Sequence, residues 1–539
     1  MLIKHFWLAA SWTPPAAALT VLLLTTSTLA QQDHHHQVLG KVHFPVTCNA
    51  DAQAAFDGAM KLQHSFWHHA AVEAFEGVLK RDPSCVMAYW GQAFSLLDNP
   101  FSPPSPKNLA QGLAALEHAQ KIGAKSQREA DYIEALLTFY RDHDKKDHRT
   151  RVLAYEEAMQ KLAERYPDDP EARIYYALAL NVAHAPTDKT YAKPLKAAEI
   201  LEAEWQRQPE HPGVVHYLIH TYDLPPLAQK GLTAAQRYSA LAPDAPHALH
   251  MPSHIFTRVG SWEQSVASNA QSAEIARKEH AVGDELHALD YMVYAHLQMG
   301  QTEAARRVVE DARRFTDDDA ARAALARAAY FALAAMPARL VMERGAWEEG
   351  AALNPRKSSF PFTEAQAHFA RAVALARSGK PDQASADLEA LKAAVDALKG
   401  KDAYWTEQVD IQRQAAEAWV AFAKGQKDEA LTALRTASDR ETKTEKHAIT
   451  PGPLAPAREQ LAEMLLEMDR PGEALEEFEA VQLTEPNRFR AIYGAARAAE
   501  LAGKHELAKR DYAKLVALAV KADSERPEIA KAREFLAAN

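Results

Sequence analysis

Apolar and polar positions alternate along most of the chain at the three- and four-residue spacing of amphipathic helices. One apolar face recurs at a constant interval, because Ala55, Ala59 and Leu62 are followed, at equal spacing, by Tyr89, Ala93 and Leu96. Runs rich in Val, Ile and Thr, which favour strands, are few. The pattern therefore predicts an all-α protein built from repeated pairs of helices.

The second helix of the first repeat has a small residue, a large apolar residue and a final proline at Ala71, Phe75 and Pro83. Small residues let paired helices approach closely, and proline ends a helix. Together with Tyr89 and Ala93, these residues resemble the tetratricopeptide repeat (TPR) family, whose units are about 34 residues long. The resemblance implies a right-handed solenoid of helical hairpins with inserted loops, of the kind that serves as an interaction scaffold.

The resemblance also indicates where a partner would bind. It covers most of residues 50–520, and in the family the first helices line a concave groove, with the fifth and ninth residues of each unit facing it. Carried over to this chain, that rule places Phe56, Met60, Trp90 and Phe94 in the groove, where they would contact a protein or peptide partner. The alternative is that these four side chains pack in the core between helices.

Breaks in the repeat pattern divide the chain. The proline-rich stretch 99–106 predicts an inserted loop, because proline ends helices and serine caps the next one. The repeats within 330–362 cannot be assigned from the pattern. The division that the pattern predicts is a signal peptide (1–30), a disordered leader (31–46), a TPR-like solenoid with a histidine-rich groove (47–320), irregular and TPR-like helices (321–440), a linker (441–456) and C-terminal TPR units (457–539).

The first 30 residues have the features of an export signal. Lys4 provides a positive start, an apolar stretch follows at 16–24, and Ala30 ends a small-residue cleavage pattern. The alternative is a retained anchor helix, but two adjacent prolines interrupt the stretch, and its uninterrupted part is too short to span a membrane. We therefore expect cleavage after Ala30 and a periplasmic or secreted protein.

The chain has two cysteines, Cys48 and Cys85, at the beginning and end of the first repeat. A helical hairpin brings its two ends together, and an exported protein meets an oxidising compartment. We expect a disulfide between these residues; the alternative is two small buried thiols.

Charge and motifs exclude several classes of function. A net charge of −10 without a basic block argues against nucleic acid as the main partner. The sequence has no His-Glu-x-x-His, no phosphate-binding glycine loop, no Gly-x-Ser-x-Gly and no Cys-x-x-Cys-His. An enzyme is therefore not indicated by any of these motifs, and a binding scaffold is the interpretation that the sequence favours. The alternative is a metal-binding protein or a metal-dependent enzyme that uses the central histidines described next.

Histidine is concentrated in one part of the chain. Of the 24 histidines, 21 lie at or before His296. His-x-x-x-His occurs twice, at His216 and His220 and again at His250 and His254, and the second pair lies one repeat length after the first. Residues four apart share one face of a helix, so each pair faces one way on neighbouring repeats.

Two such pairs on adjacent helices can converge on one volume, and imidazole suits Zn²⁺ and copper. Four imidazoles in register can also bind a carboxylate or peptide terminus, or serve in packing. Polar residues at core places of the same repeat, Ser265, Asn269 and Ser272, favour a site over packing. We expect one site, with a divalent transition metal as one of the ligands that it could take, formed by His216, His220, His250, His254 and Asp223 and surrounded by His247, His287, Asp290 and Tyr294.

Overall fold

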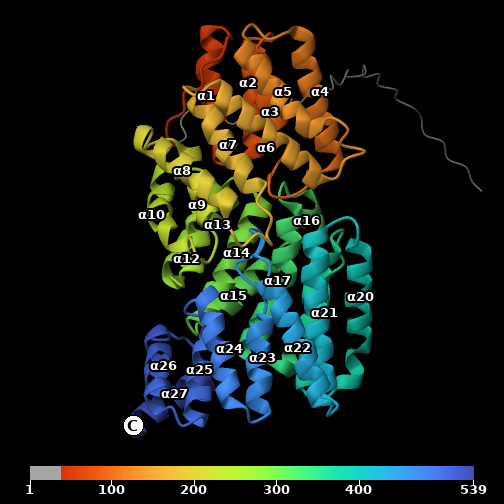
Figure 1. The fold of residues 1–539 in the computed structure, drawn as a ribbon, viewed down its shortest axis with the longest axis vertical. Helices are drawn as coiled ribbons and strands as arrows, with labels where there is room; N and C mark the ends of the chain where they lie inside the picture. Colours follow the sequence, from red (N-terminus) through yellow and green to blue (C-terminus); the bar gives the residue numbers. More distant parts are fainter. Residues whose placement is uncertain (1–37) are drawn as a thin grey trace, which may run out of the picture. The chain divides into compact units, whose positions relative to one another are not determined.

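The computed structural model describes residues 38–539, and these residues form helices joined by turns and loops, without a β-strand (Figure 1). The helices of the first half are α1 (Ala50–His64), α2 (His68–Arg81), α3 (Val86–Ser95), α4 (Pro106–Ile122), α5 (Gln127–Tyr140), α6 (His148–Arg165), α7 (Pro170–Val182), α8 (Ala192–Arg207), α9 (Pro212–Tyr222), the short 3-10 helix η2 (Ala228–Gly231), α10 (Leu232–Leu241), α11 (Pro246–His250), α12 (Pro252–Arg258) and α13 (Trp262–Lys278).

The helices of the second half are α14 (Val282–Gln298), α15 (Thr302–Ala312), α16 (Asp317–Arg322), α17 (Ala326–Arg344), α18 (Trp347–Ala351), α19 (Pro361–Arg377), the 3-10 helix η3 (Pro381–Ala384), α20 (Ser385–Leu398), α21 (Ala403–Ala423), α22 (Lys427–Thr442), α23 (Ala457–Glu467), α24 (Pro471–Thr484), α25 (Phe489–Leu501), α26 (His505–Leu518) and α27 (Pro527–Ala538). Nearly every helix packs against its neighbour in the sequence. This is the TPR-type helical-hairpin solenoid that the repeat period predicts.

The close approach of paired helices depends on glycine. A Cβ atom added at Gly91 would lie 2.3 Å from the ring of Phe75, and one added at Gly494 would lie 2.2 Å from the ring of Phe478. The glycine and the aromatic ring are thus matched in the same way near both ends of the chain. The repeat sequence therefore sets the distance between helices by pairing a residue without a side chain with a large one.

The stretch 99–106 forms the inserted loop that its prolines predict, between α3 and α4. Ser105 ends it as the N-cap of α4, because its side chain accepts a hydrogen bond from the backbone N–H of Asn108. Pro106 occupies the first turn of the helix, where a missing N–H costs nothing.

Proline interrupts the helix that carries the second histidine pair. α11 ends at His250 and α12 begins at Pro252, with Met251 between them. Met251 itself keeps a right-handed helical conformation, so the direction of the chain is nearly preserved. His250 and His254 therefore still project toward the same region.

The buried apolar side chains of the described residues form one large core from Leu39 to Phe256, a second from Ala328 to Phe535, and two smaller clusters within residues 262–340. The stretch 441–456, which we expected to be a linker, contributes Ile449 and Leu454 to the second core. Its polar residues bond to the first half of the chain, as described below. The stretch is therefore packed against both halves.

The leader expected at 31–46 is packed in its described part. Leu39, Val42 and Phe44 are buried, and the Phe44 ring lies 5.7 Å from that of Phe56. The prediction of disorder is wrong for 38–46, because these apolar side chains complete the N-terminal core. The expected signal peptide lies outside the described residues.

The expected disulfide is confirmed. Cys48 and Cys85 are joined, with their Cα atoms 5.0 Å apart, and this bond closes the first repeat. Within the described part of the chain, no helix is both long enough and apolar enough to cross a membrane.

Candidate metal centre

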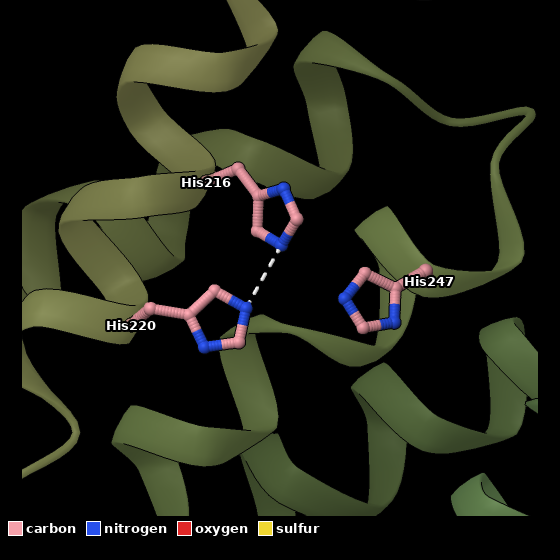
Figure 2. Close-up of side chains that lie close together, drawn as sticks. All are labelled: His216, His220 and His247. Carbon is pink, nitrogen blue, oxygen red and sulfur yellow. Dashed lines mark hydrogen bonds between the residues drawn. The ribbon is translucent and has the colours of Figure 1, made fainter. Parts of the chain in front are cut away.

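Three histidines from two neighbouring hairpins form a first cluster, which we call triad 1 (Figure 2). His216 and His220 lie on successive turns of α9, and His247 lies on α11. Each ring offers one nitrogen, and the three nitrogens lie within 4.8 Å of one another. Figure 2 shows the three rings pointing toward a common space.

A second cluster, triad 2, repeats this arrangement one hairpin further on. His250 of α11 and His254 of α12 combine with His287 of α14, again with one nitrogen from each ring within 4.8 Å of the others. The two triads adjoin, because the ring centroids of His220 and His254 are 5.9 Å apart and those of His247 and His250 are 6.0 Å apart.

The third member of each triad follows from the repeat. His247 precedes His250 by three residues, and His287 precedes Asp290 by three, so both lie one turn before the same place in successive units. Each triad thus combines a His-x-x-x-His pair with the earlier histidine of the next hairpin. The sequence predicted one site of four histidines with these two beside it; the structure instead divides the six into two sets of three.

Hydrogen bonds fix the tautomers in triad 2. His254 donates from Nδ1 to Asp223 at 2.8 Å, and His250 donates from Nδ1 to Asn269 Oδ1 at 2.6 Å. The amide of Asn269 is oriented by its own bond to the carbonyl of Ser265. In the neutral rings both Nε2 atoms therefore carry lone pairs, and they face each other at 3.0 Å. Two lone pairs at this distance repel unless a cation lies between them.

Triad 1 has a similar support. His216 donates from Nδ1 to the backbone carbonyl of His64 at 2.7 Å, which leaves its Nε2 as an acceptor, 3.1 Å from Nε2 of His220. Hydrogen bonds that hold one ring nitrogen are the usual means by which proteins orient metal-binding histidines.

The third ring of each triad has a nitrogen without a partner. His247 Nε2 and His287 Nδ1 are buried and make no hydrogen bond within the described part of the chain. A buried polar atom without a partner is costly, and a bound ion is one of the few explanations for such an atom in a native protein.

Burial also sets the protonation state. Loss of contact with water lowers the pKa of the six triad histidines, and it does so strongly for every one except His254, where the nearby carboxylate of Asp223 opposes the effect. The rings are therefore neutral at pH 7. Neutral imidazole is the form that binds a metal ion, so no proton need leave first.

Aromatic rings enclose triad 1. Phe66 contacts His216 and stacks on His247, at centroid distances of 4.4 and 5.5 Å, and Tyr238 stacks on His216 at 5.3 Å. Phe66 has a left-handed backbone conformation, with φ of 52°. For a residue with a side chain this costs roughly 1–2 kcal/mol, and such strain is concentrated at functional sites.

Asp223 supports the centre and does not join either group of candidate ligands. It accepts from His254, pairs with Arg258 at 2.8 Å and pairs with Lys446 at 3.1 Å. Burial alone would raise its pKa, but Lys446, Arg258 and His254 outweigh burial and hold the pKa well below its usual value. Asp223 therefore stays ionised and fixes the His254 ring.

Asp290 and Tyr294, predicted to surround the site, are used elsewhere. Asp290 forms a fully buried ion pair with Arg339 at 2.8 Å. The hydroxyl of Tyr294 bonds to Glu485 at 3.2 Å and accepts from Arg488 at 3.2 Å. Tyr291, which no sequence pattern indicated, lies at triad 2 instead, with its ring 4.7 Å from that of His250.

A third cluster with metal-like composition, formed by His64, Glu171 and His211, is satisfied by hydrogen bonds. Both rings bond to the carboxylate of Glu171 through Nε2, at 3.1 and 2.9 Å. The Nδ1 of His64 faces the hydroxyl of Tyr217, and that of His211 accepts from a backbone N–H. Every ring nitrogen has a partner, so this cluster serves as a support for the backbone that holds His216.

The predicted apolar groove is wrong at all four positions. Phe56, Met60, Trp90 and Phe94 are at most 1% exposed. Trp90 packs edge-on against Tyr175 and Phe44, so the N-terminal segment and α7 cover the surface that the family rule leaves open. These side chains are core residues and cannot contact a partner.

Comparisons with known proteins found only remote matches. No family model and no curated protein matches the chain. Solved structures that match include the TPR domain of P58(IPK) (11% identity, 91% of this chain and 99% of that chain covered, TM-score 0.21), the APC/C hetero-tetramer Cut9-Hcn1 (11%, 90% and 95%, 0.29) and the human IFIT1 dimer with m7Gppp-AAAA (12%, 80% and 90%, 0.36).

These likenesses are too remote to indicate a function. The architecture rests on the repeat period in the sequence and on the succession of packed helical hairpins. On those grounds the chain is a tetratricopeptide-type helical solenoid.

Proposed function

We propose that this protein binds two transition-metal ions, one in each histidine triad, and that Zn²⁺ and copper are the metals that fit. The main observation behind the proposal is that the Nε2 atoms of His250 and His254 lie 3.0 Å apart and both carry a lone pair. Both rings use their Nδ1 atoms as hydrogen-bond donors. Bonds of about 2.0–2.1 Å to a tetrahedral ion place two nitrogens about 3.3 Å apart, close to this spacing.

The donor set agrees with this choice of metals. Imidazole nitrogen suits zinc, copper, nickel and iron, whereas magnesium and calcium require oxygen. Three protein ligands leave one coordination position open, as in catalytic zinc sites and unlike closed structural ones. The centre is therefore suited to binding a further molecule on the metal, which is what a metal-dependent enzyme needs.

We further propose that the protein is exported to the periplasm or secreted. The sequence of residues 1–30 motivates this, and the Cys48–Cys85 disulfide supports it, because such bonds persist in oxidising compartments. A protein or peptide partner, expected from the family resemblance, stays a prediction, and the four residues first assigned to it are buried.

Metal analysis of the purified full chain tests the proposal. The tract His34–His36 is first replaced by alanine, because a run of adjacent histidines can bind metal loosely. We expect two equivalents of Zn²⁺ or copper per chain by mass spectrometry of the metal and by calorimetry. His220→Ala and His254→Ala should each retain one equivalent, and the double variant none.

His505→Ala is the matched control, since His505 begins α26 and is exposed. It should retain both ions. Circular dichroism shows whether each variant keeps its helices. Equal metal content in the parent and in the folded double variant would reject the proposal.

A further inference from the structure

A cavity of about 700 Å³ opens beside both triads. Its wall includes His247 and His287, the third member of each triad. The remaining wall comes from the hairpin turn at Phe66, the inserted loop around 97–108 and the segment 321–328. Pockets of this size hold small organic molecules, and this one is lined by one histidine of each triad.

The wall is apolar where the body of a ligand would lie. Phe66, Leu97, Leu325, Phe360 and Ile449 contribute to it. Phe66 stacks on His247, so an aromatic surface continues from the metal position into the cavity. Such a wall favours a flat or aromatic body through burial and ring contacts.

Charge indicates the other end of the ligand. Six neutral imidazoles leave the charge of two metal ions uncompensated, and Asp223, the carboxylate that bonds a triad ring among the described residues, already pairs with Arg258 and Lys446. An anionic group is therefore strongly favoured at the open coordination positions.

Two cationic side chains and one carboxyl group also line the cavity. Lys107 and Arg327 line the cavity, and Arg327 pairs with Asp402 but keeps a buried Nε without a hydrogen-bond partner in the described part of the chain. Asp98 lies there too, beside Asp284, and burial raises its pKa to about 7. The wall therefore repels an anion only weakly near neutral pH.

His68 lines the cavity and is 7% exposed, and both of its ring nitrogens are buried without a hydrogen-bond partner within the described residues. Because these nitrogens are covered, His68 contributes ring carbon to the apolar part of the wall.

The geometry points to a binding chamber for a small organic anion with an aromatic body, its anionic group at the metal pair and its body against Phe66 and Leu325. This inference rests on the proposed metal centre for the anionic group. The shape and lining of the cavity support the choice of an aromatic body whether or not a metal is bound.

Two hydroxamates that share one metal-binding group test the inference. Calorimetry on the metal-loaded full chain compares benzohydroxamate with acetohydroxamate, and the metal content is measured again afterwards to exclude extraction. We expect benzohydroxamate to bind at least 10-fold more tightly. Ala324→Trp fills the cavity from an exposed turn and should remove that preference while both metal ions stay bound.

The control is Ala423→Trp, an exposed alanine at the end of α21 that does not line the cavity, and it should keep the preference. The same titrations on the metal-free chain separate the two proposals.

A chain that takes up no metal yet still prefers benzohydroxamate, with the preference removed by Ala324→Trp, would reject the metal centre and keep the aromatic chamber. A metal-loaded chain that binds both hydroxamates equally, or whose preference survives Ala324→Trp, would overturn the chamber and keep the metal centre.

Discussion

His247 and His287 are each the last member of a triad that begins on the preceding helical hairpin. Both lie one turn before the same repeat position, on α11 and α14. A site made in this way needs two successive hairpins, and two such sites need three. The stacking of the solenoid, and not any single helix, therefore builds the centre.

Removal of the oxygen that orients His250 should weaken triad 2 alone. Asn269→Leu leaves Nδ1 of His250 without its acceptor, and loss of such supports typically reduces metal affinity about 10–100-fold. Competition with a chelator measures the affinity of each site. Gln366→Leu removes a buried amide in the second core and should leave both affinities unchanged. Unchanged affinity in Asn269→Leu would mean that the ring is held by other contacts.

A methyl group at Gly213 should disturb triad 1 alone. The added Cβ would lie 2.3 Å from Nδ1 of His64, whose carbonyl accepts from His216. Because His64 is buried and bonded to Glu171, it cannot move aside freely. We expect Gly213→Ala to lower the melting temperature and to reduce metal content from two equivalents to one.

Gly472→Ala is the matched control, since a Cβ there meets no atom within 4 Å and the residue is also in the first turn of a helix. It should change neither metal content nor stability appreciably. Loss of both ions in Gly213→Ala would contradict the independence of the two triads.

Reduction of the disulfide should destabilise the folded chain. The Cys48–Cys85 bond closes a loop over a sequence separation of 37, which corresponds to about 3–4 kcal/mol in the chain-entropy model. Replacement of both cysteines by alanine should shift chemical unfolding to lower denaturant concentration. Thiol titration of the unfolded, unreduced protein should detect no free thiol, and detection of two would show that the bond does not form.

Asp284 should make stability depend on pH. Burial raises its pKa to about 7, against 3.8 for an ordinary carboxyl, so the folded state holds a proton that the unfolded state has already lost between these values. The contribution of Asp284 to the free energy of unfolding therefore falls as pH rises from about 4 to 7. Above that range this contribution levels off, and any further change in stability comes from other groups. Asp284→Asn should raise the melting temperature more at pH 8 than at pH 5.

The control for this comparison is Asp144→Asn, which removes an exposed charge from a loop. An advantage of Asp284→Asn that is larger at pH 5 than at pH 8 would show that the sign is wrong. Asp98, which interacts with Asp284, gives an independent check through Asp98→Asn.

The sequence alone determined the architecture and the place of the site. Local patterns repeat at a fixed interval because each hairpin packs against its neighbour in the same way, so the small and large positions Ala71 and Phe75 can be assigned from residue size and spacing. The same period identified the two His-x-x-x-His pairs, and hairpin geometry predicted the bond between Cys48 and Cys85.

Only the tertiary structure decided how the six histidines are divided and what surrounds them. Partners far apart in sequence fix the outcome: the carbonyl of His64 holds His216, and Lys446 holds Asp223 from the other half of the chain. Phe56 and Trp90 are covered by a segment before the first repeat and by α7, which no repeat rule anticipates. The repeat pattern reflects contacts between neighbouring units, because every unit makes them. Contacts between distant units occur once each, so they produce no repeating pattern in the sequence.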